Sequence, residues 1–331
     1  MSTGAEVDGV LVQWGERLFY PGNRIVRSAP PRLSGSVGRR AAAIRRHIRA
    51  TVIYRAPQVM VKVTGGGRGM AAIAAHFRYI SKNGRLQFED DRGVTREGKE
   101  ALHDLAEQWR RGGSFIDETT SRREAFNIML SMPRGTDPLI VQRAAREFAR
   151  AELSDHRYVM VLHDHQANPH VHISVRAESR HGNRLNPRKA DLQRWRETFA
   201  EKLRGWGIEA EATRQATRGA SRNYGPVWHV KAEADGRLRA SRAAEKSGDG
   251  FLRSQSLALH AWSQIIEGLA QSDSADDRAL AARVDRFVRT TPFAVQQVRQ
   301  REKAREQRQP GHIQEVQRVA TTLRKDPQIE R

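Results

Sequence analysis

The chain has 331 residues, and its 58 lysines and arginines against 38 aspartates and glutamates give a formal net charge of +20. It contains no cysteine, which excludes disulfides, thiolate metal sites and a cysteine nucleophile. No run approaches the ~18 consecutive apolar residues of a membrane-spanning helix, and the acidic Glu6 and Asp8 are atypical of a signal peptide. We therefore expect a cytoplasmic protein without stable membrane insertion, whose charge favours a polyanionic partner such as nucleic acid.

The first segment, residues 1–57, is rich in arginine and contains loop-forming pairs such as Pro21-Gly22. We expect a basic N-terminal arm that is mostly irregular, with one short helix near residues 39–50. Such an arm can hold phosphates weakly, although a solvated tail has the same composition.

Residues 58–225 alternate between strand and helix patterns. Strands are expected at residues 59–64, 126–131, 157–163 and 170–176. Helices are expected along the Ile73, Phe77 and Ile80 stripe up to Asn83-Gly84, at residues 97–111, from the N-cap Asp137 to about Leu153, and along Leu192, Trp195, Phe199 and Leu203. Trp195 and Phe199 have the spacing of core residues more than of a base-stacking platform.

The connection between the last two strands decides the fold class. Residues 164–169 are polar and include a proline, which fits an antiparallel hairpin with a longer loop. The pattern therefore predicts an α+β fold, with an antiparallel central sheet and flanking helices, rather than a doubly wound parallel sheet. Residues 226–331 are charged and rich in arginine and glutamine, so we expect a mainly helical C-terminal region there.

Histidines are concentrated around this hairpin. His170 and His172 are two residues apart on one strand, so they share a face of the sheet, while the residues that alternate with them are apolar. His163 ends the preceding strand and, in a hairpin, lies beside that pair. Three neutral imidazoles can bind one divalent ion and leave positions open for substrate oxygens. His165 is an alternative third ligand, and Asp164 could coordinate the ion or orient a ligand.

A tyrosine on the first helix of this domain is a second candidate. At about 100° per residue, Tyr79 lies off the apolar stripe, on the flank that carries His76. A phenol ionises near pH 10, so a nucleophilic tyrosine needs nearby cations, a metal or a base. Arg78 and Lys82 are close in sequence. The alternative is an amphipathic tyrosine at the edge of the core.

The strand that ends in His163, the His170/His172 pair and the earlier Tyr79 together resemble the relaxases. These are DNA strand transferases, or mobilisation nucleases, of conjugative plasmids and integrative elements. The resemblance is closest to the single-tyrosine type of His-hydrophobic-His endonuclease. The corresponding stretches are residues 76–84, like the nucleophile motif; residues 126–133, like the motif whose serine contacts DNA near the nick; residues 163–172, like the metal motif; and residues 185–189 and 216–219, which are also similar to such proteins.

The resemblance covers roughly residues 58–225 and includes two departures. The family commonly has an aspartate five residues before the histidine pair, where this chain has His165, with Asp164 one position earlier. An asparagine often follows the pair, where this chain has Arg176. These changes concern the surroundings of the metal and leave the implied reaction class unchanged.

The resemblance implies nicking of one DNA strand at an origin of transfer by metal-assisted transesterification. Tyr79 is the implied nucleophile and forms a 5′-phosphotyrosyl intermediate. Mg²⁺ or Mn²⁺ is the implied cofactor, held by the three histidines, and Ser131 is implied to contact a phosphate near the nick. The proton acceptor for the tyrosine stays open among His76, His165 and Asp164.

The resemblance also implies partners and a location. Single-stranded DNA at the origin of transfer is the substrate, and accessory relaxosome proteins, a coupling protein and type IV secretion machinery are further partners. The expected location is the bacterial cytoplasm, with export alongside the DNA into a recipient cell. The basic residues expected to bind DNA are Arg78, Lys82, Arg180, Arg184, Arg188 and Lys189.

Three other functions fit parts of the pattern. A replication-initiator nuclease of the same superfamily shares the chemistry, but the second tyrosine found on one helix in some initiators is missing here. A non-catalytic DNA-binding accessory protein with a structural zinc is disfavoured by the absence of cysteine. A metal hydrolase that uses bound water predicts no covalent adduct.

Overall fold

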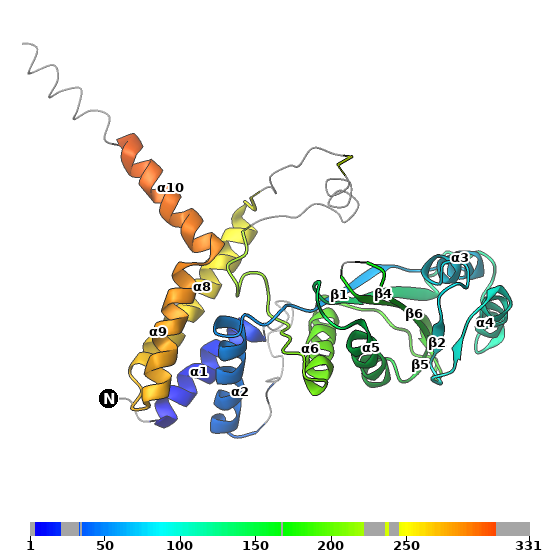
Figure 1. The fold of residues 1–331 in the computed structure, drawn as a ribbon, viewed down its shortest axis with the longest axis horizontal. Helices are drawn as coiled ribbons and strands as arrows, with labels where there is room; N and C mark the ends of the chain where they lie inside the picture. The colour runs from blue at the N-terminus through cyan, green and yellow to red at the C-terminus, as the bar shows by residue number, and fades with distance from the viewer. Residues whose placement is uncertain are drawn as a thin grey trace, which may run out of the picture. The chain divides into compact units, whose positions relative to one another are not determined.

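The computed structural model describes residues 4–20, 33, 35–166, 168–221, 236–237 and 245–308. The chain divides into two compact units (Figure 1). We call Phe19–Thr213 the sheet unit, and Met1–Leu18 with Arg214–Arg331 the helical unit. No helix within the described ranges has the length and apolar character needed to cross a membrane.

The sheet unit contains a six-stranded sheet in the order β1-β4-β6-β5-β2-β3. Its strands are β1 (Met60–Gly65), β2 (Phe88–Asp90), β3 (Thr95–Arg96), β4 (Ala125–Ser131), β5 (His156–His163) and β6 (His170–Ser179). Every neighbouring pair is antiparallel, which confirms the predicted fold class and the β5–β6 hairpin. β2 and β3 were not expected, because strands this short show no alternation of side chains.

Helices flank this sheet, and their ends follow local sequence signals. They are α3 (Met70–Ile80), α4 (Lys99–Arg111), α5 (Pro138–Glu152) and α6 (Lys189–Gly205). The sheet unit also contains α2 (Val37–Val52), which precedes the first strand. Asp137 is the N-cap of α5, and its carboxylate accepts a hydrogen bond from the backbone N–H of Leu139 at 2.8 Å. After α3, Asn83 and Gly84 adopt left-handed conformations, and a Cβ on Gly84 would lie 2.6 Å from the backbone of Gly98. Only glycine fits this turn.

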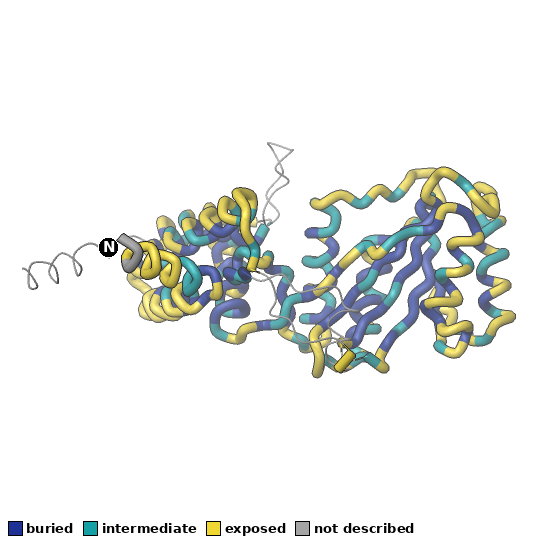
Figure 2. The backbone as a smooth tube through the Cα atoms, turned by 90° about the horizontal axis from the view of Figure 1, so that it is seen from above, coloured by how far each residue is buried: buried dark blue, intermediate teal, exposed yellow. Residues whose placement is uncertain are grey.

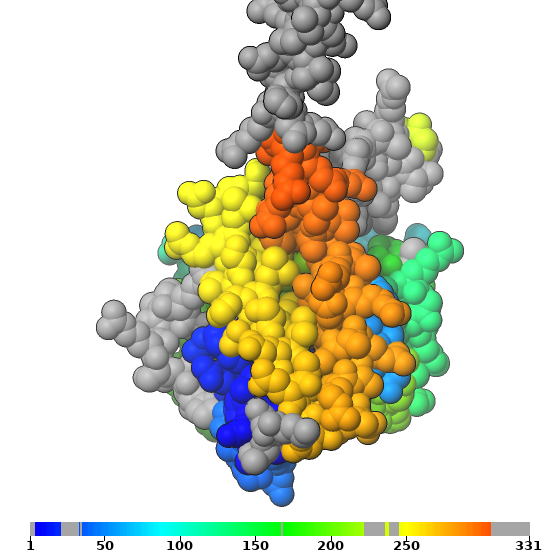
Figure 3. Space-filling model, turned by 90° about the vertical axis from the view of Figure 1, so that its left-hand side faces the viewer, coloured from blue at the N-terminus to red at the C-terminus, as the bar shows by residue number. Residues whose placement is uncertain are grey.

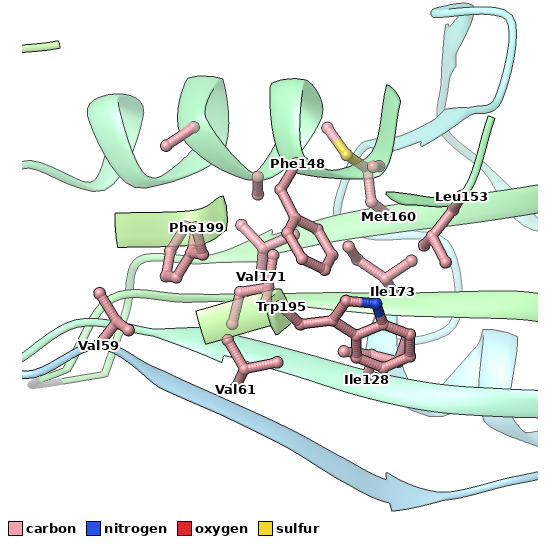
Figure 4. Packing of buried hydrophobic residues seen from close by; sticks show 14 of the residues in the cluster. Val59, Val61, Ile128, Phe148, Leu153, Met160, Val171, Ile173, Trp195 and Phe199 are labelled. Atoms are coloured by element: carbon pink, nitrogen blue, oxygen red, sulfur yellow. The ribbon is translucent and has the colours of Figure 1, made fainter. Parts of the chain in front are cut away.

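One face of the sheet is covered by α5 and α6 (Figure 4). Val171, Ile173 and Val175 of β6 point into this core, where they meet Phe148 of α5 and Phe199 of α6. Trp195 is buried in the same cluster. The predicted core role of the α6 aromatic residues is therefore confirmed, and this face is closed to solvent (Figure 2).

The opposite face is covered in part by α3 and α4. The predicted α3 stripe is buried, and it packs with Leu105 and Trp109 of α4 over Val159 and Val161 of β5. The members of the stripe are Ile73, Phe77 and Ile80. This second core lies over β5, β2 and the start of β4, so β1 and the end of β4 are outside it.

The expectation of a mostly irregular N-terminal arm is wrong for the described residues. The structure has α1 (Gly4–Phe19) as well as α2 in this segment. In α1, Val7, Leu11 and Leu18 are almost fully buried and recur at spacings of four and seven, which is a helical period. The loop-forming proline pairs, which suggested irregular chain, lie outside the described residues.

A buried polar network ties α2 to the segment after α6. The imidazole of His47 lies 2.7 Å from a carboxylate oxygen of Glu211 and 2.5 Å from the hydroxyl of Tyr20. Arg46 and Arg204 lie 3.7 Å and 3.9 Å from the other Glu211 oxygen. Burial raises the pKa of Tyr20 to about 12, so this phenol stays protonated. A buried carboxylate needs such partners, because an unpaired one costs several kcal/mol.

The described part of the helical unit confirms the predicted helical C-terminal region. Its helices after α6 are α8 (Asp249–Ala270), α9 (Ala275–Arg289) and α10 (Pro292–Arg308). The ring of Trp262 packs against Phe287, and its indole N–H donates to the carbonyl of Thr217 at 2.9 Å. Figure 3 shows α8 and α9 side by side. Gly268 of α8 lies so close to Val10 of α1 that a Cβ there would meet it at 2.8 Å.

Candidate metal centre

The register of the β5–β6 hairpin brings three histidines together. His163 is opposite His170, and His172 lies one alternate position further along β6. The ring centroids of His163 and His172 are 4.7 Å apart, and each of these rings lies 5.0 Å from His170. One nitrogen from each ring lies within 4.8 Å of the others, so the three can hold one metal ion.

Two backbone carbonyls orient these rings. Nε2 of His163 hydrogen bonds to the carbonyl oxygen of Ile80 at 2.6 Å, and Nδ1 of His170 bonds to that of Asn168 at 2.9 Å. A carbonyl only accepts, so the bonded nitrogens carry the protons, and the second nitrogen of each ring carries a lone pair. This is how metal-binding histidines are usually held.

Two buried nitrogens in the cluster make no hydrogen bond within the described chain. They are Nδ1 of His163 and Nδ1 of His172. A buried polar atom without a partner costs about 1–3 kcal/mol, and a metal ion at either nitrogen removes this cost. The residues therefore fit a divalent metal.

His163 and His172 are also neutral at physiological pH, as metal ligands must be. Burial, followed by the charges of the neighbouring imidazoles, lowers the pKa of His172 to about 3. Burial likewise lowers the pKa of His163, and the positive charge of Lys82 acts in the same direction. Neutral imidazoles with free lone pairs are thus available without prior loss of protons.

The flank of α3 adds Tyr79 to this centre. The Tyr79 side chain is 73% exposed, so it is not part of the core. The His76 ring lies between Tyr79 and the cluster, with its centroid 6.1 Å from the Tyr79 ring and 6.4 Å from the His172 ring. Ile80, which follows the tyrosine, supplies the carbonyl that orients His163. The helix that carries the tyrosine is therefore attached directly to the metal centre.

His76 is a partly buried imidazole beside Tyr79. Its Nε2 atom is buried and makes no hydrogen bond within the described chain. Burial lowers the pKa of His76 to about 4, so the ring is neutral at pH 7. Arg78 and Lys82, both exposed, place positive charge on either side of Tyr79 along the chain.

The other predicted site residues lie at different distances from the cluster. Ser131 of β4 is opposite His170, is buried, and directs its hydroxyl to the carbonyl of Pro169 at 3.3 Å. His165 is exposed, and its ring centroid lies 5.2 Å from that of His163. Asp164 is also exposed. Within the described ranges, neither His165 nor Asp164 belongs to the group of residues that can share one ion.

The predicted DNA-binding arginines that follow the metal strand lie away from the histidines. β6 runs from His170 to Ser179, which at about 3.3 Å per residue separates its ends by about 30 Å. Arg180 pairs with Asp91 at 2.7 Å, and Arg184 lies 3.4 Å from Glu124. The structure does not bring these two arginines to the metal centre. Arg188 and Lys189 lie at the start of α6.

Arg176, at the position where the family resemblance implies an asparagine, holds the end of α4 in place. Its buried guanidinium donates to the carbonyls of Trp109 and Gly112, each at 2.7 Å, and to that of Ser114. These carbonyls belong to the C-terminal end of α4 and the turn after it, where a cation is favourable. The sequence signal was a basic residue in a strand that is otherwise buried.

The fold and the site define an α+β domain with three histidines that can hold one metal ion and an exposed tyrosine beside them. Residues 79–208 match the relaxase family model described as MobA/VirD2-like, nuclease domain. The matched stretch begins at Tyr79 and includes all three histidines, so this part of the chain is similar to the relaxase nuclease domains. This confirms the family resemblance and supports DNA nicking and single-stranded DNA binding. A search of curated proteins found no match.

Proposed function

We propose that this protein nicks one DNA strand at an origin of transfer by metal-assisted transesterification, for conjugative transfer or mobilisation. The observation that carries the proposal is the position of the exposed Tyr79 on α3, the helix whose last carbonyl orients His163. Phosphoryl transfer through a tyrosine requires the nucleophile and the metal site to be held in a fixed position relative to each other.

His163, His170 and His172 would hold the ion, Mg²⁺ or Mn²⁺. When bound, a divalent ion polarises the scissile phosphate and offsets the charge that develops on it. The donor set favours Mn²⁺ over Mg²⁺, because imidazole nitrogen binds Mn²⁺ more readily and Mg²⁺ prefers oxygen ligands.

Tyr79 performs the covalent step. Its phenolic oxygen attacks the phosphorus, so that the bond from this oxygen to phosphorus forms while the bond from phosphorus to the 3′ oxygen breaks. The phenolic proton passes to a base, and the 3′ oxygen leaves with a proton from solvent as a 3′-OH. The DNA stays attached through its 5′-phosphate, and because the phosphodiester count is unchanged, a 3′-OH can later reseal the strand.

We assign the proton transfer to His76. Its ring lies between Tyr79 and His172, and because burial lowers its pKa, the ring is neutral at pH 7 and one nitrogen carries a lone pair. His165 and Asp164 are in the exposed connection between β5 and β6 and are the alternatives.

The remaining residues bind DNA and partners. We assign Ser131 to a phosphate near the nick, and Arg78 and Lys82 to the backbone beside the tyrosine. Arg180, Arg184, Arg188 and Lys189 would contact the strand further from the nick. We further propose that residues 226–331 recruit relaxosome, coupling or secretion proteins in the bacterial cytoplasm, that residues 58–225 form the relaxase domain, and that residues 1–57 act as a basic arm.

The test uses single-stranded oligonucleotides that tile the element's transfer origin, labelled at the 5′ or the 3′ end, with Mn²⁺ or Mg²⁺. We expect a denaturation-resistant protein–DNA adduct that retains the 3′ label and is abolished by EDTA. Cleavage without an adduct would indicate hydrolysis by metal-bound water. Binding without cleavage of any oligonucleotide would indicate an accessory protein, and an adduct formed only with replication-origin DNA would indicate an initiator.

A further inference from the structure

Among the described residues, no helix covers one part of the sheet face that carries the histidines. In β4, Ile128 and Leu130 point into the core under α5 and α6, so Met129 points to the opposite face. In β1, Val61 points into the same core, so Met60 and Lys62 also point to the opposite face. Met60 is 48% exposed, Lys62 is exposed and Met129 is half-buried. We call Met60, Lys62 and Met129 the open floor.

The open floor continues directly from the metal centre. Lys62 is opposite Met129, and Met129 is opposite His172, so the three form one row across β1, β4 and β6. Met60 begins the next row, which passes through Ser131 to His170. Opposed residues in antiparallel strands have Cα atoms about 5 Å apart. Lys62 is thus about 10 Å from His172 along the row, and its long side chain can reach back toward the metal.

The chemistry of the floor combines one unpaired cation with two thioethers. Among the described residues, Lys62 has no ion pair, whereas four arginines around the sheet are paired with carboxylates: Arg122, Arg146, Arg180 and Arg184. A lysine on an edge strand also prevents pairing with other sheets, but this role does not explain an exposed Met60 on the same face. Methionine packs well against aromatic rings through its sulfur, and every nucleobase offers such a ring.

We propose that the open floor binds the single strand next to the scissile phosphate, with Lys62 on a neighbouring phosphate and Met60 and Met129 against a base. The inference rests on the proposed nicking function, because it takes the histidine cluster as the position of the scissile phosphate. It assigns binding to Met60 and Lys62, which lie outside the motif stretches on the edge strand β1, together with Met129 of the neighbouring β4. The contacts are to backbone and ring faces, so they apply to any sequence.

The test measures binding of the full-length protein to labelled oligothymidine across a salt series, with EDTA present so that no strand is cut. A phosphate contact to single-stranded DNA contributes about 0.7 to the slope of log affinity against log salt. Lys62→Ala should therefore lower the slope by about 0.7 and weaken binding about fivefold at 0.1 M salt. Lys62→Arg should restore both values, and Met60→Ala should weaken binding without changing the slope.

Lys202→Ala is the matched control, because Lys202 is on α6, which covers the other face of the sheet. It should leave the slope unchanged. A wild-type slope and affinity in Lys62→Ala would contradict the proposal that the open floor binds DNA, even where the wild-type protein forms its metal-dependent adduct. A lowered slope in a protein that forms no adduct with any oligonucleotide would uphold a DNA-binding floor and contradict the nicking function instead.

Discussion

The two faces of the central sheet differ in what they require of the sequence. Along β6, Val171, Ile173 and Val175 enter the core under α5 and α6, while His170 and His172 point the other way and form the candidate metal centre. The first face is closed and apolar apart from the indole nitrogen of Trp195, whereas the second face carries buried histidine nitrogens that make no hydrogen bond within the described chain. Neighbouring residues of one strand thus serve stability and chemistry separately, and mutations should separate the two.

The largest expected effect is on the second face. Tyr79→Phe should abolish the protein–DNA adduct, because the attacking oxygen is lost, and should leave the unfolding free energy unchanged, because the side chain is 73% exposed. Tyr54→Phe is the matched control, since Tyr54 is 66% exposed and lies outside the metal centre. Adduct yield is read on a denaturing gel. An adduct of normal yield in Tyr79→Phe would exclude this tyrosine as the nucleophile.

The His172→Ala variant tests whether the second face binds the metal. Loss of one of three ligands should weaken Mn²⁺ binding by at least about 100-fold, since even residues that only orient ligands affect metal affinity 10–100-fold. Isothermal titration measures this directly. The metal-free protein should keep its stability, because the variant removes a buried nitrogen that has no partner. Unchanged Mn²⁺ affinity would remove His172 from the centre.

Ile173 is the next residue on the same strand. Ile173→Ala should have the opposite effects, lowering the stability of the protein and leaving its metal affinity unchanged. A fully buried isoleucine reduced to alanine leaves a cavity and costs about 3 kcal/mol. Denaturant unfolding should show this loss, while the Mn²⁺ affinity of the folded variant stays within a few-fold of wild type. A variant that lost metal binding while keeping its stability would contradict the division between the two faces.

Acid should destabilise the metal-free protein, because the buried imidazoles of His76 and His172 resist protonation in the folded state. The pKa values of His76 and His172 are lowered to about 4 and about 3, whereas unfolded histidine titrates near 6.5. Between pH 6.5 and these values the unfolded chain binds more protons, so stability falls as the pH decreases. We expect a loss of about 2 kcal/mol for each of the two histidines from pH 7 to pH 5. Equal stability at both pH values in urea titrations would contradict the burial of these imidazoles.

The smallest effect is expected far from the centre. Arg180 is exposed and paired with Asp91, so Arg180→Ala should change stability by less than about 1 kcal/mol. Its distance along β6 predicts slightly weaker binding of long oligonucleotides and no change for short ones centred on the nick. Fluorescence anisotropy with both lengths tests this. Weaker binding of the short oligonucleotide would show that Arg180 contacts DNA near the nick and would contradict this prediction.

The hairpin and its histidines could be predicted because a two-residue period assigns each side chain to a face. Other features lacked such a signal. The carbonyls of Ile80 and Asn168 orient His163 and His170. Such contacts cannot be predicted from residue types, because every residue has a backbone carbonyl. Arg180 follows the metal strand in sequence, yet a strand of this length carries the chain about 30 Å from the metal centre.

The position of the edge strand β1 and the N-terminal helix α1 are two further features that we could not predict fully from the sequence. Lys62 sits in a β-branched run that indicates a strand, but only the observed pairing with β4 places it in the row of His172. In α1, Val7, Leu11 and Leu18 carry a helical period, and the arginine-rich, proline-containing context obscured it. Long-range pairing and competing local signals were therefore the features that the sequence alone did not resolve.

The central claim is that DNA becomes attached to Tyr79, and mass spectrometry of the isolated adduct tests it most directly. The chain has five tyrosines, so a nuclease- and protease-digested adduct yields peptides that identify the modified residue. We predict a nucleotide attached through its 5′-phosphate to the peptide that contains Tyr79, and to no other. The same modification on Tyr20, Tyr54, Tyr158 or Tyr224, or its absence after strand cleavage, would contradict the account.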